Sequence, residues 1–178
     1  MSVSIRLIKR ADIASVVQLS LAAWDPASRS FEEILGSDIY HIIWPHWQKS
    51  QREEVEVLCQ ASLVADNDVT TWVAEGKGEI AGFIAVKLNR SDQSGEVEML
   101  AVSPSHQRQG IGAALNQHAL NYMLAEGMRL AIVETAGDPS HEAARRSYKN
   151  AGYTQLPIAR YYQVLSAATT SVNAAGEE

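Results

Sequence analysis

Residues 95–115 read GEVEMLAVSPSHQRQGIGAAL, and this stretch decides the fold. An apolar run from Val97 to Val102 ends at Ser103-Pro104, and a polar loop containing Gly110 and Gly112 leads directly into a helical pattern. The free N–H groups of a helix's first turn and the positive end of its dipole together attract an anion. The stretch therefore predicts a strand, a phosphate-binding loop and a helix in immediate succession.

The 178-residue chain has the composition of a globular domain, with 46% hydrophobic and 20% charged residues. Its formal net charge of −6 argues against nucleic acid as a partner, because phosphate binding requires clustered Lys and Arg. The single cysteine, Cys59, excludes an intramolecular disulfide and a Cys-rich zinc site; we expect it in the core, and we expect no metal. No apolar run reaches about 18 residues and no signal peptide is evident, so a cytoplasmic protein without membrane contact is expected.

The residues before this stretch predict one strand, a helical block and two further strands. The first helix is expected to stop at Asp25-Pro26, because the residue before a proline disfavours the helical conformation. Gly76-Lys77-Gly78 predicts a hairpin. The expected elements are a strand over Ser2–Lys9, helices near Phe31–Leu35, Ile39–Trp44 and Pro45–Ser62, and strands over Thr70–Glu75 and Glu79–Leu88.

The residues after the loop predict a helix, a buried strand, a second helix and two closing strands. The expected ranges are Ile111–Glu126, Met128–Thr135, Pro139 to about Ala151, Tyr153–Pro157 and Tyr161–Leu165. A strand–helix–strand unit requires a parallel pair of strands. We therefore expect one α/β domain over residues 1–165, with a mixed sheet of about six to seven strands flanked by helices. Residues 166–178 lack apolar bulk and are predicted to form a flexible tail.

The glycine loop does not match the common nucleotide-binding motifs. No Gly-Lys-Ser/Thr follows at the spacing of a P-loop. Leu115 occupies the place of the third glycine in a dinucleotide-binding fingerprint. From the residues alone, a phosphate cradle and a tight packing of the helix on the sheet remain equal alternatives.

Two motifs together resemble the GNAT superfamily of N-acetyltransferases. Gln107-x-x-Gly110-x-Gly112 is similar to that family's Gln/Arg-x-x-Gly-x-Gly/Ala signature, and residues 144–153 (ARRSYKNAGY) are similar to its Ala-x-x-x-Tyr-x-x-x-Gly-Phe/Tyr motif. The order of predicted elements also resembles the family's fold over roughly Val3 to Leu165.

The resemblance implies acetyl-CoA as co-substrate. It assigns the pyrophosphate to the loop and the helix start, and the pantetheine arm to the exposed edge of the preceding strand. The residues implied for the pyrophosphate are Gln107, Arg108, Gln109, Gly110, Ile111, Gly112 and Ala113, and those implied for the arm are Leu100, Ala101 and Val102. The Arg108 side chain could equally be a solvated arginine.

The reaction implied is direct attack of a primary amine on acetyl-CoA within a ternary complex. Tyr148 occupies the family's position for the acid that protonates the departing thiolate; packing of its ring on the sheet is the alternative. Glu98 and Glu134 are equal candidates for the base, ahead of Glu96, which is expected to share a strand face with Glu98. Each carboxylate could instead be solvent-facing.

One position departs from the family pattern. His141 stands seven residues before Tyr148, where many members have an Asn that holds the pantetheine arm. A His can still donate a hydrogen bond there, and its ordinary pKa near neutrality would also allow proton transfer.

Two other functions remain open at this stage: a CoA-binding sensor or interaction module without catalysis, and a nucleotide-binding domain. The acceptor is expected to be a small-molecule or peptide amine, bounded in part by the aromatic segment Phe31–Trp47. The resemblance leaves a homodimer open.

Overall fold

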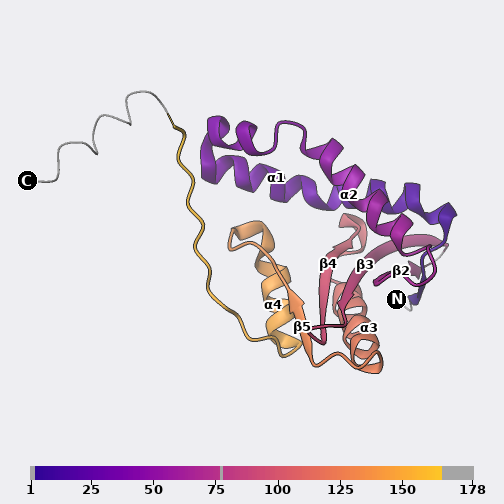
Figure 1. Ribbon diagram of the computed structural model, residues 1–178. Helices are drawn as coiled ribbons and strands as arrows, with labels where there is room; N and C mark the ends of the chain where they lie inside the picture. Colours follow the sequence, from indigo (N-terminus) through magenta and orange to yellow (C-terminus); the bar gives the residue numbers. More distant parts are fainter. Residues whose placement is uncertain (1–2, 77, 166–178) are drawn as a thin grey trace, which may run out of the picture.

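The computed structural model describes residues 3–76 and 78–165, and its centre is a five-stranded mixed sheet (Figure 1). The strands lie side by side in chain order as β1 (Ser4–Leu7), β2 (Val69–Gly76), β3 (Glu79–Asn89), β4 (Ser94–Val102) and β5 (Leu130–Val133). The pairs from β1 to β4 are antiparallel, and β4 pairs with β5 in parallel. The predicted mixed α/β class is confirmed, whereas the predicted six to seven strands are not, because five are found in the described residues.

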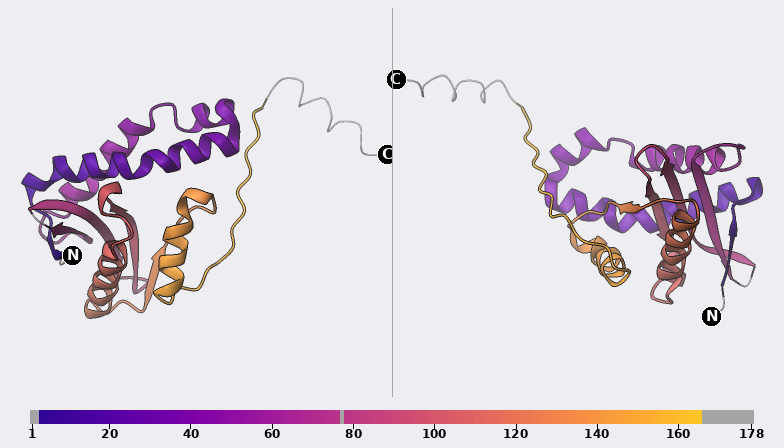
Figure 2. Two further views of the ribbon diagram at one scale, coloured as in Figure 1. Left: turned by 180° about the vertical axis from the view of Figure 1, so that it is seen from behind. Right: turned by 60° about the horizontal axis from the view of Figure 1, so that its bottom comes forward.

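Helices cover both faces of this sheet (Figures 1 and 2). The longer ones are α1 (Ile13–Ile43), α2 (Trp47–Ala61), α3 (Ile111–Ala125) and α4 (Glu142–Asn150), and three 3-10 turns lie at Arg10–Asp12, Pro104–His106 and Pro139–His141. One core forms between the sheet and α1 and α2, and a second forms between the sheet and α3. The short helix α4 lies beside β5 at the sheet's edge.

Helix α1 continues through the predicted stop at Asp25-Pro26, so that prediction is wrong. A proline inside a helix removes one backbone hydrogen bond and costs about 3 kcal/mol. Burial of Ala27 and Tyr40 beyond it, together with packing on α2, favours continuation. The interruption lies at Gly36, whose φ of 76° and ψ of 156° suit glycine and separate the two predicted helices here. Pro45 precedes α2 and does not lie in its first turn.

Strand β4 carries a β-bulge at Glu98. Its register with β3 pairs Val86 with Val97 and Ala85 with Met99, which leaves Glu98 as an extra residue. Val97 therefore packs in the α3 core, and Met99 packs in the core under α1 and α2. The bulge allows successive buried residues of one strand to serve opposite faces of the sheet.

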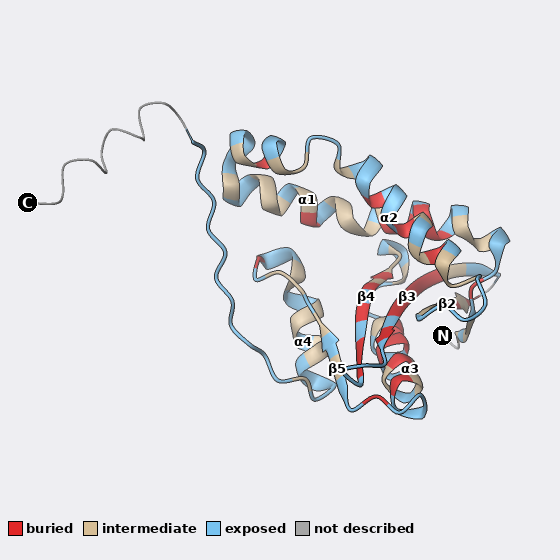
Figure 3. Cartoon of the chain, in the orientation of Figure 1, coloured by how far each residue is buried: buried red, intermediate tan, exposed pale blue. Residues whose placement is uncertain are grey.

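The residues after α4 do not form the predicted closing strands Tyr153–Pro157 and Tyr161–Leu165. Within the described part of the chain, the C-terminal arm (Tyr153–Leu165) is extended and makes one backbone hydrogen bond beyond itself, from Tyr153 N–H to Tyr148 O at 3.1 Å. Figure 3 shows it exposed beyond Tyr153, which is half-buried. A strand needs a ladder partner, and here the arm lies away from the sheet.

Two further predictions can be compared with the fold. Cys59 of α2 is fully buried in the core between the sheet and the helices α1 and α2, and burial raises its pKa to about 12, so its expected place in the core is confirmed. No helix within the described ranges is both long and apolar enough to cross a membrane. The predicted tail, residues 166–178, lies outside the described residues.

Candidate active site

The centre of the candidate site is the place where β4 and β5 separate. Their pairing runs from Ser94 opposite Leu130 to Val97 opposite Val133 and ends there, while β4 continues to Val102. The N–H of Ser103 donates to Ala81 O of β3 at 2.8 Å. Because main-chain groups alternate sides along a strand, those of Leu100 and Val102 face the open side.

This open strand edge agrees with the expected place for an added pantetheine arm, with one difference. Ala101 was predicted to contribute with its neighbours, but its main-chain groups face β3, and its side chain is buried. The carbonyl of Val102 accepts a hydrogen bond from Gln107 Nε2 at 3.2 Å, which ties the loop to the end of the strand.

The loop presents free N–H groups at the start of α3. Gly110 caps the helix with φ of 81°, and the first helical bond runs from Ala114 N–H to Gly110 O at 3.0 Å. The N–H groups of Ile111, Gly112 and Ala113 therefore have no partner among the described residues. They form the arrangement that binds an anion at a helix N-terminus.

The two loop glycines are not explained by packing of the protein. A Cβ at Gly112 would lie 3.6 Å from Val102 Cγ2, an ordinary contact, and a Cβ at Gly110 would meet nothing within 4 Å. Gly82, in contrast, is a packing glycine, because its Cβ would lie 2.9 Å from Ala101 O. The positive φ of Gly110 favours glycine by itself, but neither side-chain packing nor the backbone requires glycine at Gly112, which fits a pyrophosphate that approaches closely.

Tyr148 lies on α4, half-buried, with its ring against Tyr153. Burial raises the pKa of the Tyr148 hydroxyl to about 12. The Tyr153 hydroxyl donates to Asn116 Oδ1 of α3 at 3.3 Å. Asn116 is 1% exposed, and its Nδ2 has no hydrogen-bond partner among the described residues. The hydrogen bond to Asn116 therefore holds in place the Tyr153 ring that contacts Tyr148.

Glu98 lines an open hollow of about 660 Å³ on the sheet. Burial, and to a smaller extent the nearby carboxylates of Glu96 and Glu54, raise the pKa of Glu98, while Lys87 opposes them. The bulge breaks the alternation on which the expected shared face of Glu96 and Glu98 rested, yet both line this hollow.

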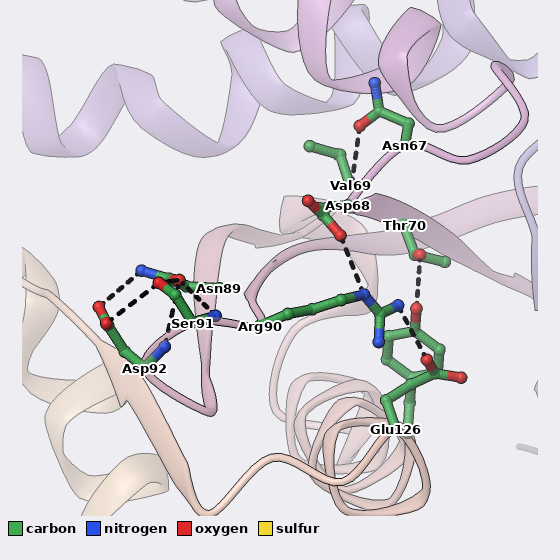
Figure 4. A network of polar contacts seen from close by, with 10 residues as sticks. Asn67, Asp68, Val69, Thr70, Asn89, Arg90, Ser91, Asp92 and Glu126 are labelled. Carbon is green, nitrogen blue, oxygen red and sulfur yellow. Dashed lines mark hydrogen bonds and ion pairs between the residues drawn. The ribbon is translucent and has the colours of Figure 1, made fainter.

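The rim of the hollow is a polar network (Figure 4). Arg90 donates from Nε to Asp68 at 3.3 Å and from its terminal nitrogen to Glu126 at 3.1 Å. Asn89 donates to Asp92 at 2.7 Å. The lining of the hollow holds four carboxylates against two cations, Lys87 and Arg90, so its surface is acidic on balance.

Glu134 is placed differently from Glu98. It lies exposed just beyond β5, on the side of the C-terminal arm. Tyr162 and, to a smaller extent, Glu134 raise the pKa of Arg160 on that arm. Both carboxylates are exposed, but Glu134 has a cationic neighbour, whereas Glu98 has carboxylate neighbours and a raised pKa.

His141 is held by Asp138 at the start of α4. Asp138 caps the turn by accepting from Ser140 N–H at 3.0 Å, and its other oxygen bonds His141 Nδ1. Burial alone would raise the pKa of Asp138, but hydrogen bonds from Ser140, Ser30 and His141 outweigh it and lower the pKa to about 2. The bond to Nδ1 leaves Nε2 of His141 as the free ring nitrogen.

The predicted aromatic segment meets this histidine. The Phe31 ring is stacked between Trp44, at 5.3 Å between centroids, and His141, at 5.6 Å. Stacking of these rings on one another thus explains part of the aromatic content of the segment Phe31–Trp47. It also brings the segment expected to shape the acceptor site against the residue at the family's Asn position.

Sequence reasoning missed three features of the site. Asp138 was predicted as a helix cap but not as the partner of His141, and Asn116 and the bulge at Glu98 were not predicted. The only available signal for Asn116 was a polar residue on the apolar face of an amphipathic helix.

The comparison with known families agrees with this geometry. Residues 36–153 match the acetyltransferase (GNAT) family. The chain belongs to this family. The resemblance on which the expected fold rested is thereby confirmed.

Individual relatives are more distant. A mycothiol acetyltransferase of Streptomyces griseus is 32% identical over 95 residues, which are 53% of this chain and 30% of that protein. An uncharacterized N-acetyltransferase, YsnE of Bacillus subtilis, is 30% identical over 95 residues, which are 53% of this chain and 62% of that protein. The match thus spans less than two thirds of either relative.

The fold has a counterpart among solved structures. The PaiA N-acetyltransferase of Thermoplasma acidophilum, solved in complex with coenzyme A, superposes with a TM-score of 0.65 at 19% identity, covering 84% of this chain and 89% of that one. At this identity, the similarity shows the GNAT fold alone.

Proposed function

We propose that this member of the GNAT family transfers the acetyl group of acetyl-CoA to a primary amine by direct attack within a ternary complex. The observation that carries the proposal is the continuity of two features. The open edge of β4 at Leu100 and Val102 leads directly into the free N–H groups of Ile111, Gly112 and Ala113. The pantetheine arm of CoA is extended and ends at a pyrophosphate, so the arm matches the strand edge and the pyrophosphate matches the start of α3.

The cradle residues have separate tasks. The first turn of α3 binds the pyrophosphate through main-chain N–H groups, and Gln107 fixes the loop against Val102. The main-chain groups of Leu100 and Val102 pair with the amides of the arm as an added strand would. An N–H group on this edge also lies where it can stabilise negative charge that develops on the acetyl oxygen. The hydrogen bond to the Asp138 carboxylate places the proton of the neutral His141 ring on Nδ1, so Nε2 accepts a hydrogen bond from an amide N–H of the arm, at the position where many members have Asn.

Tyr148 acts as the acid for the departing thiolate. Its pKa of about 12 keeps the hydroxyl protonated at neutral pH. An acid must hold its proton until the thiolate forms, and a buried phenol meets that requirement. The bond from Tyr153 to Asn116 shows that the neighbouring phenol is already engaged.

Glu98 is favoured over Glu134 as the base that removes the proton of the amine. The amine is a cation in water and must become neutral before it attacks. Partial desolvation and the neighbouring Glu96 carboxylate raise the pKa of Glu98, which makes it a stronger base than a carboxylate of ordinary pKa, and it opens into the hollow. The acidic rim attracts the cationic form of the acceptor, so a positively charged amine is the favoured substrate class.

An acetyl-CoA consumption assay over a panel of amines tests the proposal, with mass spectrometry to detect the acetylated product. Turnover with at least one amine, lost in Tyr148→Phe, is expected. Binding of CoA together with hydrolysis alone across the panel would instead support a binding module. Stabilisation by ATP or NAD but not by CoA, in a thermal-shift comparison, would contradict both.

A further inference from the structure

One buried amide of α3 has an incomplete set of hydrogen bonds. Asn116 is 1% exposed, and its Oδ1 accepts from the Tyr153 hydroxyl at 3.3 Å, whereas its Nδ2 has no partner among the described residues. A buried N–H without a partner is unfavourable, because it has given up its hydrogen bonds to water and gained none in return. Such a group in a folded protein commonly serves a ligand or a buried water.

The place of Asn116 along the sheet follows from two contacts between α3 and β4. A Cβ on Gly112 would lie 3.6 Å from Val102 Cγ2, at the end of β4, and a Cβ on Gly95, at the start of β4, would lie 2.7 Å from Met123 Cγ. The helix therefore runs back along the strand. Asn116 is four residues beyond Gly112, a rise of about 6 Å, which corresponds to about two residues of a strand. It is thus level with the middle of β4.

The middle of β4 is also where the sheet opens. The pairing with β5 ends at Val97 opposite Val133, and the bulge at Glu98 follows directly. In the proposed function, the pantetheine arm runs along the open edge of β4 from the pyrophosphate toward this bulge. Its thioester end therefore reaches the level of Asn116.

The Asn116 side chain lies on the side of α3 that faces α4. Its oxygen is bonded to Tyr153, which follows α4 in the chain, and the Tyr153 ring contacts that of Tyr148 on α4. The two polar atoms of a carboxamide lie on opposite sides of its axis, so the bond at Oδ1 fixes the amide and directs its N–H groups away from the Tyr153 hydroxyl. A buried donor of fixed orientation thus lies between the two helices, level with the opening of the sheet.

We propose that Asn116 Nδ2 donates a hydrogen bond to a carbonyl oxygen at the thioester end of the pantetheine arm of acetyl-CoA. This assignment rests on the proposed function, because it takes the arm to run along β4. Two carbonyl oxygens belong to that end, one in the last amide of the arm and one in the acetyl group, and either accepts such a bond. Asn116 then holds the arm while Tyr148 acts on the sulfur.

Calorimetric titration with three ligands tests this assignment. The variant is Asn116→Leu in a Tyr153→Phe background: leucine keeps the branched shape of asparagine without its N–H groups, and no tyrosine hydroxyl is left without its acceptor. Affinity for acetyl-CoA should fall about tenfold. An equal fall for CoA assigns the bond to the last amide of the arm, and an unchanged affinity for CoA assigns it to the acetyl oxygen. Affinity for phosphoadenosine diphosphate, the nucleotide part of CoA without the arm, should stay unchanged.

Two control variants isolate the effect of the N–H groups. Tyr153→Phe alone keeps them and should bind acetyl-CoA nearly as well as the unmodified chain. Gln117→Leu makes the same amide-to-leucine change on the exposed side of α3 and should not alter binding. Without ligand, the double variant should unfold at the same temperature as Tyr153→Phe or at a higher one, since it has lost a buried donor that had no partner.

Three outcomes would overturn the assignment. The first is equal affinity of the double variant and Tyr153→Phe for acetyl-CoA, which would show that the N–H groups do not contact the arm. The second is an equal loss of affinity for phosphoadenosine diphosphate, because the substitution would then have disturbed the loop. The third is an unmodified chain that binds neither CoA nor acetyl-CoA, and this outcome alone would overturn the proposed function as well.

Discussion

The rings of Tyr148 and Tyr153 meet edge to face, with centroids 5.7 Å apart and 69° between their planes. Burial raises the pKa of both phenols, and a hydrogen bond to Asn116 partly offsets this for Tyr153. The two hydroxyls differ in their contacts: that of Tyr153 donates to Asn116, and that of Tyr148 has no recorded partner among the described residues. The two residues therefore form a matched pair in which one hydroxyl is engaged with α3 and the other is the proposed acid.

This pair gives the first prediction. Tyr148→Phe removes only the proton donor, so turnover should fall about 10²-fold or more while acetyl-CoA binding changes little. Tyr153→Phe should keep most turnover and lose about 1 kcal/mol of stability, since it leaves Asn116 Oδ1 without a donor. Steady-state kinetics and urea unfolding separate the two effects. Equal losses of turnover in both variants would contradict the assignment of Tyr148.

The loop glycines give a second prediction. Gly110→Ala and Gly127→Ala both place a side chain at positive φ, 81° and 79°, with nothing within 4 Å of the new Cβ. Both should therefore lose about 1 kcal/mol of stability through backbone strain. Only Gly110→Ala, and Gly112→Ala with it, should weaken CoA binding. Calorimetric titration with CoA measures this, and unchanged affinity in both loop variants would show that the cradle does not bind the pyrophosphate.

The hollow predicts a specific pH dependence. The base acts when it is deprotonated, so kcat/KM should rise with pH through the raised pKa of Glu98. Glu98→Gln should lower turnover about 10²-fold or more and remove that acidic limb. Glu96→Gln should move the limb to lower pH, because the Glu96 carboxylate helps to raise the pKa of Glu98. Glu134→Gln should leave the profile unchanged, and loss of the limb in this variant alone would transfer the role to Glu134.

Asp138 predicts an acid-sensitive part of the stability. Its pKa is lowered to about 2 in the folded chain, so it stabilises the fold above its unfolded pKa, and this contribution is lost as the pH falls through 2. Asp138→Asn should cost about 2 kcal/mol at pH 7, and the difference should shrink between about pH 4 and pH 2. Asp25→Asn on the exposed face of α1 is the control, expected to change stability by less than about 1 kcal/mol. A cost of Asp138→Asn that does not vary with pH would contradict this account.

The order of elements around the cradle could be predicted because each has a local signal. The strand, the glycine loop and α3 follow from the apolar run at Val97–Val102 and from Gly110 and Gly112. Asp138-Pro139 likewise predicts the cap that the structure shows. Such patterns are determined by neighbours along the chain and can be read without the fold.

The errors concern features that depend on distant partners. The continuation of α1 through Pro26 depends on burial of Ala27 and Tyr40 and on packing against α2, and the bulge at Glu98 depends on the register with β3. The arm has strand-like residues, but strand formation requires a ladder that its own sheet does not provide. The bond between Asp138 and His141 could have been anticipated from their spacing, yet only the turn geometry determines it.

The bulge at Glu98 has a consequence for how this activity could be gained or lost. Without Glu98, Val97 and Met99 would be adjacent and would alternate as in any regular strand, each on the face it already occupies. The proposed base is therefore an inserted residue in β4, and the packing of neither core requires it. Deleting a single codon would leave a folded protein that still holds the coenzyme but has no group to deprotonate an acceptor. If Glu98 is the base, an enzyme and a coenzyme-binding module without catalysis differ by one residue in this chain.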